Sequence, residues 1–320
     1  MSIKGRICSL AIRKHLSMNP IVNQCAISNI GTFFADDGSE ALVKTLSLTK
    51  NTTDRGSRYE VARECGKGNA SKAIYYIHGG AFVSPLNVFY RNLSSHFIRA
   101  AHDAEVILLD YSLAPEFCYP TQLDEAYDVW NEITDKLGYS PKDVLIGGDS
   151  AGGNIVLSLM LKLRDERREM PLGAFCISPW SDMTASGESY FKNYGRDVVF
   201  GQKGVRATDE LRLRLIKSGL FSHVADIPLE ARSEAYISPV FGEYYGFPQM
   251  MFTVGEYEML FSDTYDIAKK LEKENIQVEL EIGKRMFHIY PLLRNILPES
   301  RRSFKKILSF IEKCYKNKDL

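Results

Sequence analysis

The amino-acid sequence predicts an α/β protein with a mostly parallel central sheet and helices on both faces. Three observations lead to this prediction. Short apolar runs alternate with segments of helical periodicity from residue 73 to residue 316. Ser150 lies between one such run and a helix-length apolar segment, with glycines on either side. The chain has 320 residues, 45% of them hydrophobic, which suffices for one large domain or two smaller ones.

Charge balance and cysteine spacing exclude several classes of protein. With 40 basic and 40 acidic side chains the formal net charge is zero, so we expect no binding to nucleic acid. The six cysteines have neither C-x-x-C nor zinc-finger spacing, so we expect reduced thiols in a cytoplasmic protein, with a secreted enzyme as the alternative. No stretch approaches the ~18 apolar residues of a membrane-spanning helix, so we expect no stable membrane insertion.

The N-terminal part of the chain has a weaker pattern than the rest. Residues 1 to about 50 are expected to form one short helix followed by loop. Four side chains are expected to share a face of that helix: Ile7, Leu10, Ala11 and Lys14. Segments 55–61 and 66–71 are typical of an edge hairpin and its turn. Residues 73–77, rich in aromatic and β-branched side chains, then predict the first buried strand.

From there strands and helices alternate. Further strands are expected at 104–109, 143–146, 173–177, 249–254 and 278–282. Helices are expected at 89–101, 121–137, 206–217, 262–274 and 299–316, and from 150 into a charged tail at 164–169. Thr121 is expected to cap its helix and Gly138 to end it. Residues 185–235 interrupt this alternation with polar sequence, and we expect them to form an insertion over the top of the sheet.

The stretch around Ser150 predicts a nucleophile. Gly148-Asp149-Ser150-Ala151-Gly152 has the G-x-S-x-G pattern of a strand–serine–helix elbow. Glycines on both sides avoid Cβ clashes where backbone packs on backbone, and the following helix favours negative charge at its N-terminus. A bare match arises by chance in a chain with 23 glycines, but the strand before it and the helix after it favour a nucleophile.

A serine nucleophile needs an imidazole base to take its proton. The chain has six histidines: His15, His78, His96, His102, His223 and His288. A serine elbow is followed along the chain by an acid and then by the histidine, and only His288 lies after the last predicted strand. We therefore expect His288 to be the base; the alternative is simple core packing beside Phe287.

The third member of such a triad is an acid that orients the imidazole. Three acidic residues follow the strand at 249–254: Glu256, Glu258 and Asp263. Glu258 is favoured because it lies between strand and helix, where its side chain can reach back. Asp263 is expected to cap the next helix, and Glu256 is the second choice.

Glycines follow the buried strand at 73–77, in His78-Gly79-Gly80-Ala81-Phe82. Their backbone N–H groups can point into a site without obstruction and hold an oxyanion. The alternative is a plain turn from strand to loop.

These residues, taken together, resemble the hormone-sensitive-lipase-like branch of the α/β-hydrolases, a group of carboxylesterases. The resemblance covers roughly 75–292 and rests on ordered motifs ending at His288: Tyr76-Ile77-His78-Gly79-Gly80-Ala81-Phe82, Asp110-Tyr111-Ser112-Leu113-Ala114-Pro115-Glu116, Gly148-Asp149-Ser150-Ala151-Gly152-Gly153-Asn154, Ser178-Pro179-Trp180-Ser181-Asp182, Ser238-Pro239 and Val254-Gly255-Glu256-Tyr257-Glu258-Met259-Leu260.

The resemblance implies an α/β-hydrolase fold with a helical cap. Cap segments would be 1–50 and 185–235, and the catalytic core would be 51–184 and 236–320. The oxyanion hole would use the N–H groups of Gly80, Ala81 and Ala151, with Gly79 shaping the loop. Ala81 stands where many members have a third glycine, and Glu258 where many have aspartate.

The implied activity is that of a serine carboxylesterase acting on short- to medium-chain acyl esters through Ser150, His288 and Glu258. Neither a metal nor an organic cofactor is expected, and the partner would be a small-molecule ester; a homodimer is one oligomeric state left open. A deacetylase or amidase acting on a specific metabolite is the alternative. A non-catalytic receptor on the same fold is less favoured, because such receptors lack the working histidine, whereas this chain has His288.

Overall fold

A computed structural model describes residues 1–15, 45–67, 70–102, 104–205, 207–218 and 227–318. One eight-stranded sheet organises these residues, in the order β1-β2-β4-β3-β5-β6-β7-β8. The strands are β1 (Leu46–Thr52), β2 (Arg58–Glu64), β3 (Ala73–Ile77), β4 (Glu105–Leu109), β5 (Val144–Asp149), β6 (Gly173–Ile177), β7 (Gln249–Gly255) and β8 (Val278–Gly283). The six strands β4-β3-β5-β6-β7-β8 pair in parallel with their neighbours, whereas β2 runs antiparallel to both β1 and β4.

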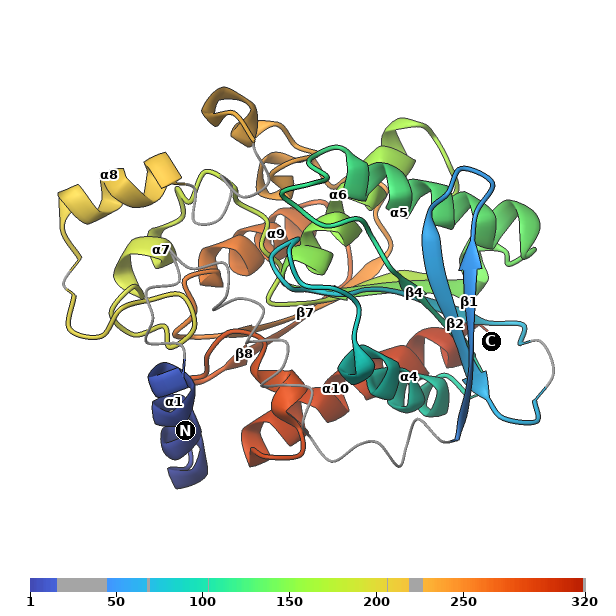
Figure 1. The fold of residues 1–320 in the computed structure, drawn as a ribbon, viewed down its shortest axis with the longest axis horizontal. Helices are drawn as coiled ribbons and strands as arrows, with labels where there is room; N and C mark the ends of the chain where they lie inside the picture. The colour runs from blue at the N-terminus through green and yellow to red at the C-terminus, as the bar shows by residue number, and fades with distance from the viewer. Residues whose placement is uncertain (16–44, 68–69, 103, 206, 219–226, 319–320) are drawn as a thin grey trace.

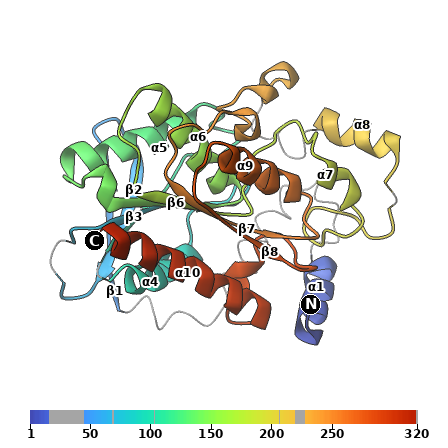
Figure 2. The same cartoon turned by 180° about the vertical axis from the view of Figure 1, so that it is seen from behind.

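Helices cover both faces of this sheet (Figures 1 and 2). On one side lie α4 (Val88–Ala100) and α10 (Pro298–Lys318), and on the other lie α5 (Thr121–Asn131), α6 (Ala151–Asp165) and α9 (Phe261–Lys273). The central strands β3 to β6 are buried along their whole length because both faces are covered. The predicted α/β architecture with a mostly parallel sheet is therefore confirmed.

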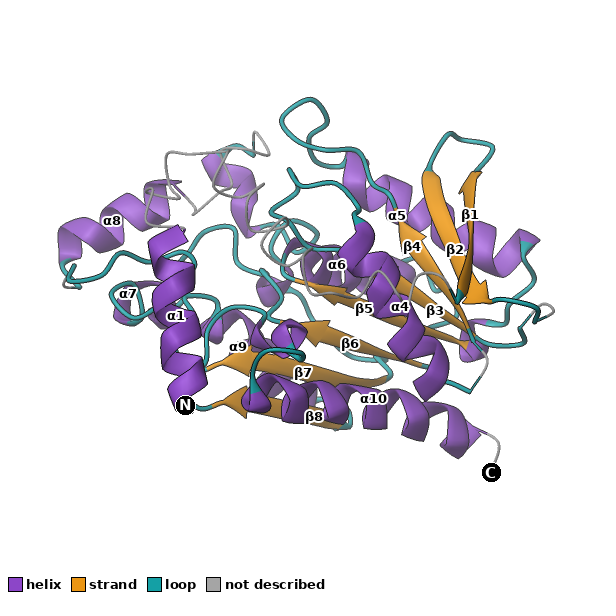
Figure 3. Ribbon diagram, turned by 60° about the horizontal axis from the view of Figure 1, so that its bottom comes forward, coloured by secondary structure: helices purple, strands orange, loops and turns teal. Residues whose placement is uncertain are grey.

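Three further helices lie near the end toward which β6, β7 and β8 point: α1 (Ile3–His15), α7 (Glu188–Lys192) and α8 (Asp209–Ser218) (Figure 3). Two of them come from the insertion expected at 185–235. In parallel sheets, functional side chains collect at the carboxyl ends of the strands, because all the strands end on the same side. No helix among the described residues is long and apolar enough to cross a bilayer.

The edge of the sheet differs from the prediction. The hairpin consists of β1 and β2, and its turn is formed by residues 53–57. Of the segment expected to form the turn, Gly66 lies in a turn directly after β2, and residues 68 and 69 lie outside the described residues. The sequence missed β1 because this edge strand is half exposed and carries Lys50 and Asn51, which hide its alternation. Residues 46–50 therefore belong to the sheet and not to the N-terminal segment expected to form part of a cap.

The buried face of α1 is also not the predicted one. Gly5, Cys8 and Ile12 face inward, while Ile7 and Leu10 are each 61% exposed. Ala11 is exposed as well, and the side chain of Lys14 lies outside the described residues. Because apolar residues lie on both sides of this helix, periodicity alone could not select the inner face.

Two details of α5 were predicted wrongly. Pro120 occupies the N-cap position, and Thr121 already lies inside the helix, where no side chain caps it; Asp124 in the first turn complements the helix dipole instead. After Asn131 the helix continues as one π-helical turn, although the sequence predicts one continuous helix over 121–137. Gly138 follows with a φ of +78°, as expected of a glycine that ends a helix.

Candidate active site

Ser150 occupies a tight turn between β5 and α6. Its backbone has φ +52° and ψ −119°, a strained conformation for a residue with a side chain, and its N–H donates to Ile177 O at 3.0 Å. A Cβ added to Gly152 would lie 2.1 Å from Ile77 O, and one added to Gly148 would lie 2.7 Å from Gly152 O. Backbone thus packs on backbone on both sides of the serine, as the sequence predicts, although α6 begins one residue later, at Ala151.

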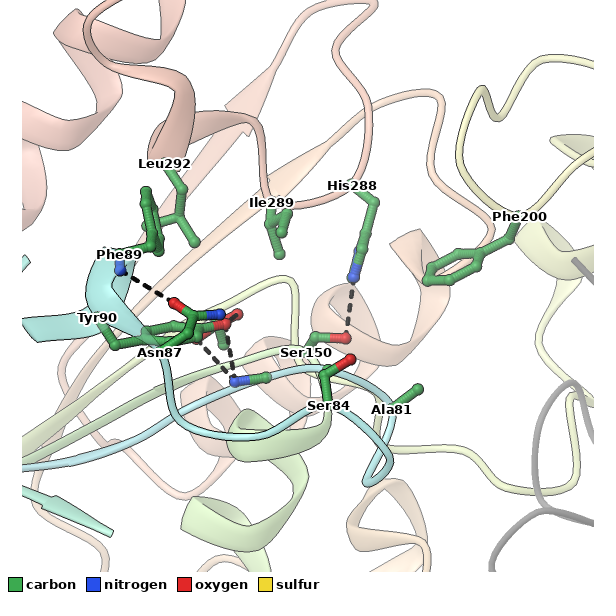
Figure 4. Close-up of a pocket in the computed structure, with 13 residues that line it drawn as sticks. Ala81, Ser84, Asn87, Phe89, Tyr90, Ser150, Phe200, His288, Ile289 and Leu292 are labelled. Atoms are coloured by element: carbon green, nitrogen blue, oxygen red, sulfur yellow. Dashed lines mark hydrogen bonds between the residues drawn. The ribbon is translucent and has the colours of Figure 1, made fainter. Parts of the chain in front are cut away.

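His288 lies in the loop after β8 and points at Ser150 (Figure 4). Its Nε2 lies 2.9 Å from Ser150 Oγ, and its Nδ1 lies 2.9 Å from Glu258 Oε2. The imidazole is 3% exposed, and the ring of Phe200 packs against it with centroids 4.6 Å apart. The structure therefore brings together three side chains that lie 108 and 30 residues apart along the chain, in the order that the sequence predicts.

Glu258 is completely buried, and both of its carboxylate oxygens are occupied. One oxygen contacts His288; the other accepts hydrogen bonds from the hydroxyl of Ser178 at 2.7 Å and from the N–H of Gly255. Ser178 Oγ in turn accepts from Ile289 N at 3.1 Å. This serine therefore ties the acid to the residue that follows the histidine.

The two rival acids have other partners. Glu256 is exposed, and its Oε2 accepts from Arg285 N at 2.7 Å. Asp263 is buried inside α9, where it accepts from the N–H groups of Ser181 and Asp182, both at 2.8 Å. The expectation that Asp263 caps this helix is wrong, because Leu260 holds the N-cap position. Burial raises the pKa of the Asp263 carboxyl well above its usual range.

The remaining described histidines lie outside this group. His78 is buried and stacks on Tyr111 with ring centroids 4.2 Å apart; burial lowers the pKa of its imidazole to about 4. His96 meets Phe304 edge to face, and His102 is exposed on the surface. The side chain of His15, and His223 as a whole, lie outside the described residues.

The glycine-containing loop after β3 forms one wall of the same cavity. Gly80 and Ala81 line it together with Ser150 and His288, and both have positive φ angles, +116° and +53°. The N–H of Gly79 is already used, because it donates to Asp149 Oδ1 at 3.1 Å and to Tyr90 Oη at 3.2 Å. Gly79 thus shapes the loop, whereas the N–H groups of Gly80, Ala81 and Ala151 have no acceptor among the described residues.

Asp149 holds the glycine-containing loop after β3 in place, a role that the sequence analysis did not predict. Its buried carboxylate accepts from Tyr76 Oη at 2.8 Å and from Tyr90 Oη at 3.0 Å, besides the N–H of Gly79. Burial raises the pKa of this carboxyl to about 6, although the three hydrogen bonds and His288 act in the opposite direction. Its place inside the serine motif was the signal that could have identified it.

The cavity over Ser150 is small and mostly apolar. It encloses about 50 Å³ and is lined on one side by Phe89, Ile289 and Leu292. Ser84 and Asn87 supply polar atoms, and Asn87 Oδ1 also accepts from Phe89 N at 3.0 Å, which fixes the start of α4 (Figure 4). Among the described residues no group of His, Cys, Asp or Glu side chains is arranged to hold a metal ion.

The insertion holds the loop that carries the acid. Asn193 Nδ2 donates to Glu258 O at 2.8 Å, and Asp197 Oδ2 accepts from Met259 N at 2.7 Å. Asp197 is fully buried, and this burial raises the pKa of its carboxyl. Sequence reasoning missed both residues, because nothing distinguishes them from other polar side chains in the insertion.

Comparisons with known proteins are consistent with this geometry. A family profile described as alpha/beta hydrolase fold matches residues 74–292. The chain is 30% identical to an esterase of Acinetobacter venetianus over 247 residues, 76% of each chain, and 29% identical to an acetyl-hydrolase of Streptomyces hygroscopicus over 75% of each. Among solved structures, an esterase from the bacterial hormone-sensitive lipase family is similar with a TM-score of 0.79 and 25% identity, covering 98% of this chain and 99% of that one.

Proposed function

This chain belongs to the α/β-hydrolase fold family, in its hormone-sensitive-lipase-like branch of carboxylesterases, and on that premise we propose that Ser150, His288 and Glu258 are its catalytic triad. The chain is a carboxylic ester hydrolase, which excludes the non-catalytic receptor as an alternative. The observation that carries the assignment is the chain of contacts from Ser150 Oγ through both nitrogens of His288 to Glu258, each 2.9 Å long.

The proposed reaction has two steps. His288 Nε2 accepts the proton of Ser150 as Oγ attacks the ester carbonyl carbon, and the N–H groups of Gly80, Ala81 and Ala151 hold the oxyanion. The carbon–oxygen bond to the alcohol then breaks, and His288 protonates the departing alkoxide. Water attacks the acyl-enzyme and gives its proton to His288, and the proton returns to Ser150 as the acid leaves.

Glu258 keeps the second proton of the imidazole on Nδ1 and stabilises the imidazolium that forms. Its burial supports this role, because an ionised acid in a poorly solvated place interacts strongly with a neighbouring cation. The hydrogen bonds from Ser178 and Gly255 to the other carboxylate oxygen fix the orientation of the acid toward His288.

We also propose that the substrates are short- to medium-chain acyl esters of small molecules. The cavity beside Ser150 is limited in size and walled by Phe89 and Leu292, which favours a short apolar acyl group. A deacetylase or amidase remains the second candidate, because one relative is an acetyl-hydrolase. Turnover of anilides in preference to esters would support that candidate.

The direct test is hydrolysis of p-nitrophenyl esters from acetate to octanoate by the wild type and by Ser150→Ala. We expect turnover that declines as the acyl chain lengthens, and a fall in kcat of about 10⁴-fold or more in the variant. Full activity in a folded Ser150→Ala protein would show that another group is the nucleophile.

A second test separates the two glutamates after β7. Glu258→Gln should lower kcat by orders of magnitude, about 10³-fold, because a neutral amide no longer stabilises the imidazolium. Glu256→Gln is the matched control and should keep wild-type rates, because Glu256 contacts the backbone of Arg285 rather than His288. The opposite result would exchange their roles.

The arrangement around the core is proposed on the same basis. Segment 185–235, together with the N-terminal residues before β1, would act as a cap over the carboxyl ends of the strands.

A cytoplasmic location is supported by the free thiols of Cys8, Cys176 and Cys314, and cell fractionation would test it. A homodimer would be tested by size-exclusion chromatography with light scattering.

A further inference from the structure

A second cavity lies beside the catalytic one, between α1, the insertion and the loops that follow β7 and β8. It encloses about 370 Å³. Four basic side chains line it: Arg6, Arg196, Lys203 and Arg285. Within the described part of the chain, no carboxylate is among its lining residues. The cavity therefore carries positive charge, although the whole chain has no net charge.

One acid lies close to these four basic side chains without lining the cavity. Glu256 is the carboxylate beside Arg285, and its Oε2 accepts the backbone N–H of that residue at 2.7 Å. Arg196 lies with its guanidinium 5.4 Å from the ring centre of Tyr257. A concave surface lined by charges of one sign concentrates ions of the opposite sign, so an anion is the natural occupant.

Apolar side chains also line this cavity. Met1, Leu10 and Val198 line it, together with the rings of Tyr257 and Phe287. Leu10 is also part of the exposed apolar row on α1 with Ile3 and Ile7. A cavity lined by both cationic and apolar side chains matches a ligand that carries an anionic head on a hydrocarbon body, because each part of the ligand meets a surface of suitable polarity.

The cavity contacts the catalytic loops without sharing a residue with the catalytic cavity. Phe287 directly precedes His288, and Tyr257 directly precedes Glu258. A ligand packed against these two rings would therefore touch the loops that carry the proposed base and acid, but would leave the space over Ser150 open.

We propose that this cavity binds an anionic amphiphile, that is, a carboxylate or phosphate on an alkyl chain. Alkyl carboxylates are also the class of acid that ester hydrolysis releases. The same chemistry occurs in free fatty acids and in the lipids of an anionic membrane surface, so the test has to separate these two sources.

Calorimetric titration of the wild type with decanoate and decyl phosphate, below micelle formation, tests the proposal. Decanol tests the hydrocarbon alone, and inorganic phosphate tests the charge alone. We expect saturable binding of the two amphiphiles, much weaker binding of decanol and phosphate, and weaker affinity at high salt because the charges are screened. Equal binding of decanol or of inorganic phosphate would overturn the proposal.

The double substitution Arg6→Ala with Lys203→Ala locates the site. Both side chains are exposed, so the variant should fold, and we expect about tenfold weaker binding of decanoate. Removing two exposed charges from α10, with Arg302→Ala and Lys305→Ala, is the matched control and should change nothing. Binding of decanoate that is as tight in the first pair as in the wild type would refute the assignment.

Two further measurements distinguish ligand binding in this cavity from the proposed function of the triad and from binding to a membrane surface. Ester hydrolysis by the Arg6→Ala and Lys203→Ala protein should stay at the wild-type rate, whatever becomes of the Ser150 assignment. Vesicles of phosphatidylglycerol and of phosphatidylcholine test the membrane source by co-sedimentation. Binding to the anionic vesicles without binding of free decanoate would replace the cavity by a membrane-facing surface and overturn the proposal as stated.

Discussion

Replacing Asp149 by asparagine would test how this buried carboxylate affects stability. Asp149 is fully buried, and its charge faces Tyr76, Tyr90, Tyr111 and His288. Burial raises the pKa of its carboxyl from 3.8 to about 6 in the folded protein. Since one pKa unit corresponds to about 1.4 kcal/mol, this shift amounts to about 3 kcal/mol. Asparagine keeps the shape of the side chain and removes the titration.

The sign of the effect follows from proton linkage. Between pH 4 and pH 6 the folded protein holds the proton on Asp149 more tightly than the unfolded chain does. This contribution to stability is therefore present at low pH and is lost as pH rises through about 6. The free energy of unfolding of the wild type, minus that of Asp149→Asn, should fall by about 1.4 kcal/mol per pH unit from pH 4 to 6 and level off above about pH 7.

Urea unfolding of both proteins across this pH range measures that difference, and other titrating groups cancel because both proteins contain them. A difference that does not change with pH would mean that the pKa of Asp149 is not raised. A difference that grows with pH would mean that the hydrogen bonds from Tyr76, Tyr90 and Gly79 outweigh the cost of burying the charge.

Two further predictions follow from contacts around the triad. Ser178→Ala removes the hydroxyl that donates to Glu258 at 2.7 Å, so we expect roughly tenfold lower kcat with little change in KM, measured on p-nitrophenyl butyrate. An unchanged kcat would show that Gly255 alone orients the acid. Gly152→Ala places a Cβ 2.1 Å from Ile77 O and should destabilise the protein by about 3 kcal/mol or more in urea unfolding. Gly153→Ala, whose Cβ would lie 2.8 Å from Pro179 Cβ, should cost less, and equal losses would contradict this steric explanation.

The sequence identified the serine and the histidine of the candidate triad more clearly than it identified the acid. Ser150 could be chosen from the elbow pattern around it, and His288 from its position in the order of residues along the chain. Both signals can be read directly from the sequence. Glu256, Glu258 and Asp263 all follow β7, so position alone left three choices. The turn after Gly255 separates them, because it directs Glu258 back under the histidine while Glu256 points to Arg285 and Asp263 lies in α9.

The supporting residues depended even more on the fold. Ser178 and Asp149 lay in motifs that could be read, but their partners come from other strands and loops. Asn193 and Asp197 had no local signal, because their task is to hold a loop more than 60 residues away. Local patterns carry no information about which distant backbone group will need a partner.

By itself the sequence determined the alternation of strands and helices, the elbow at Ser150, and the order of the residues that follow it. These features depend on the periodicity of apolar side chains and on the small size of glycine, which act within a few residues along the chain. Only the tertiary structure decided which face of α1 is buried, which acid meets His288, and that Asp149 holds the glycine loop. Those outcomes depend on packing and on hydrogen bonds between segments that meet only after the chain has folded.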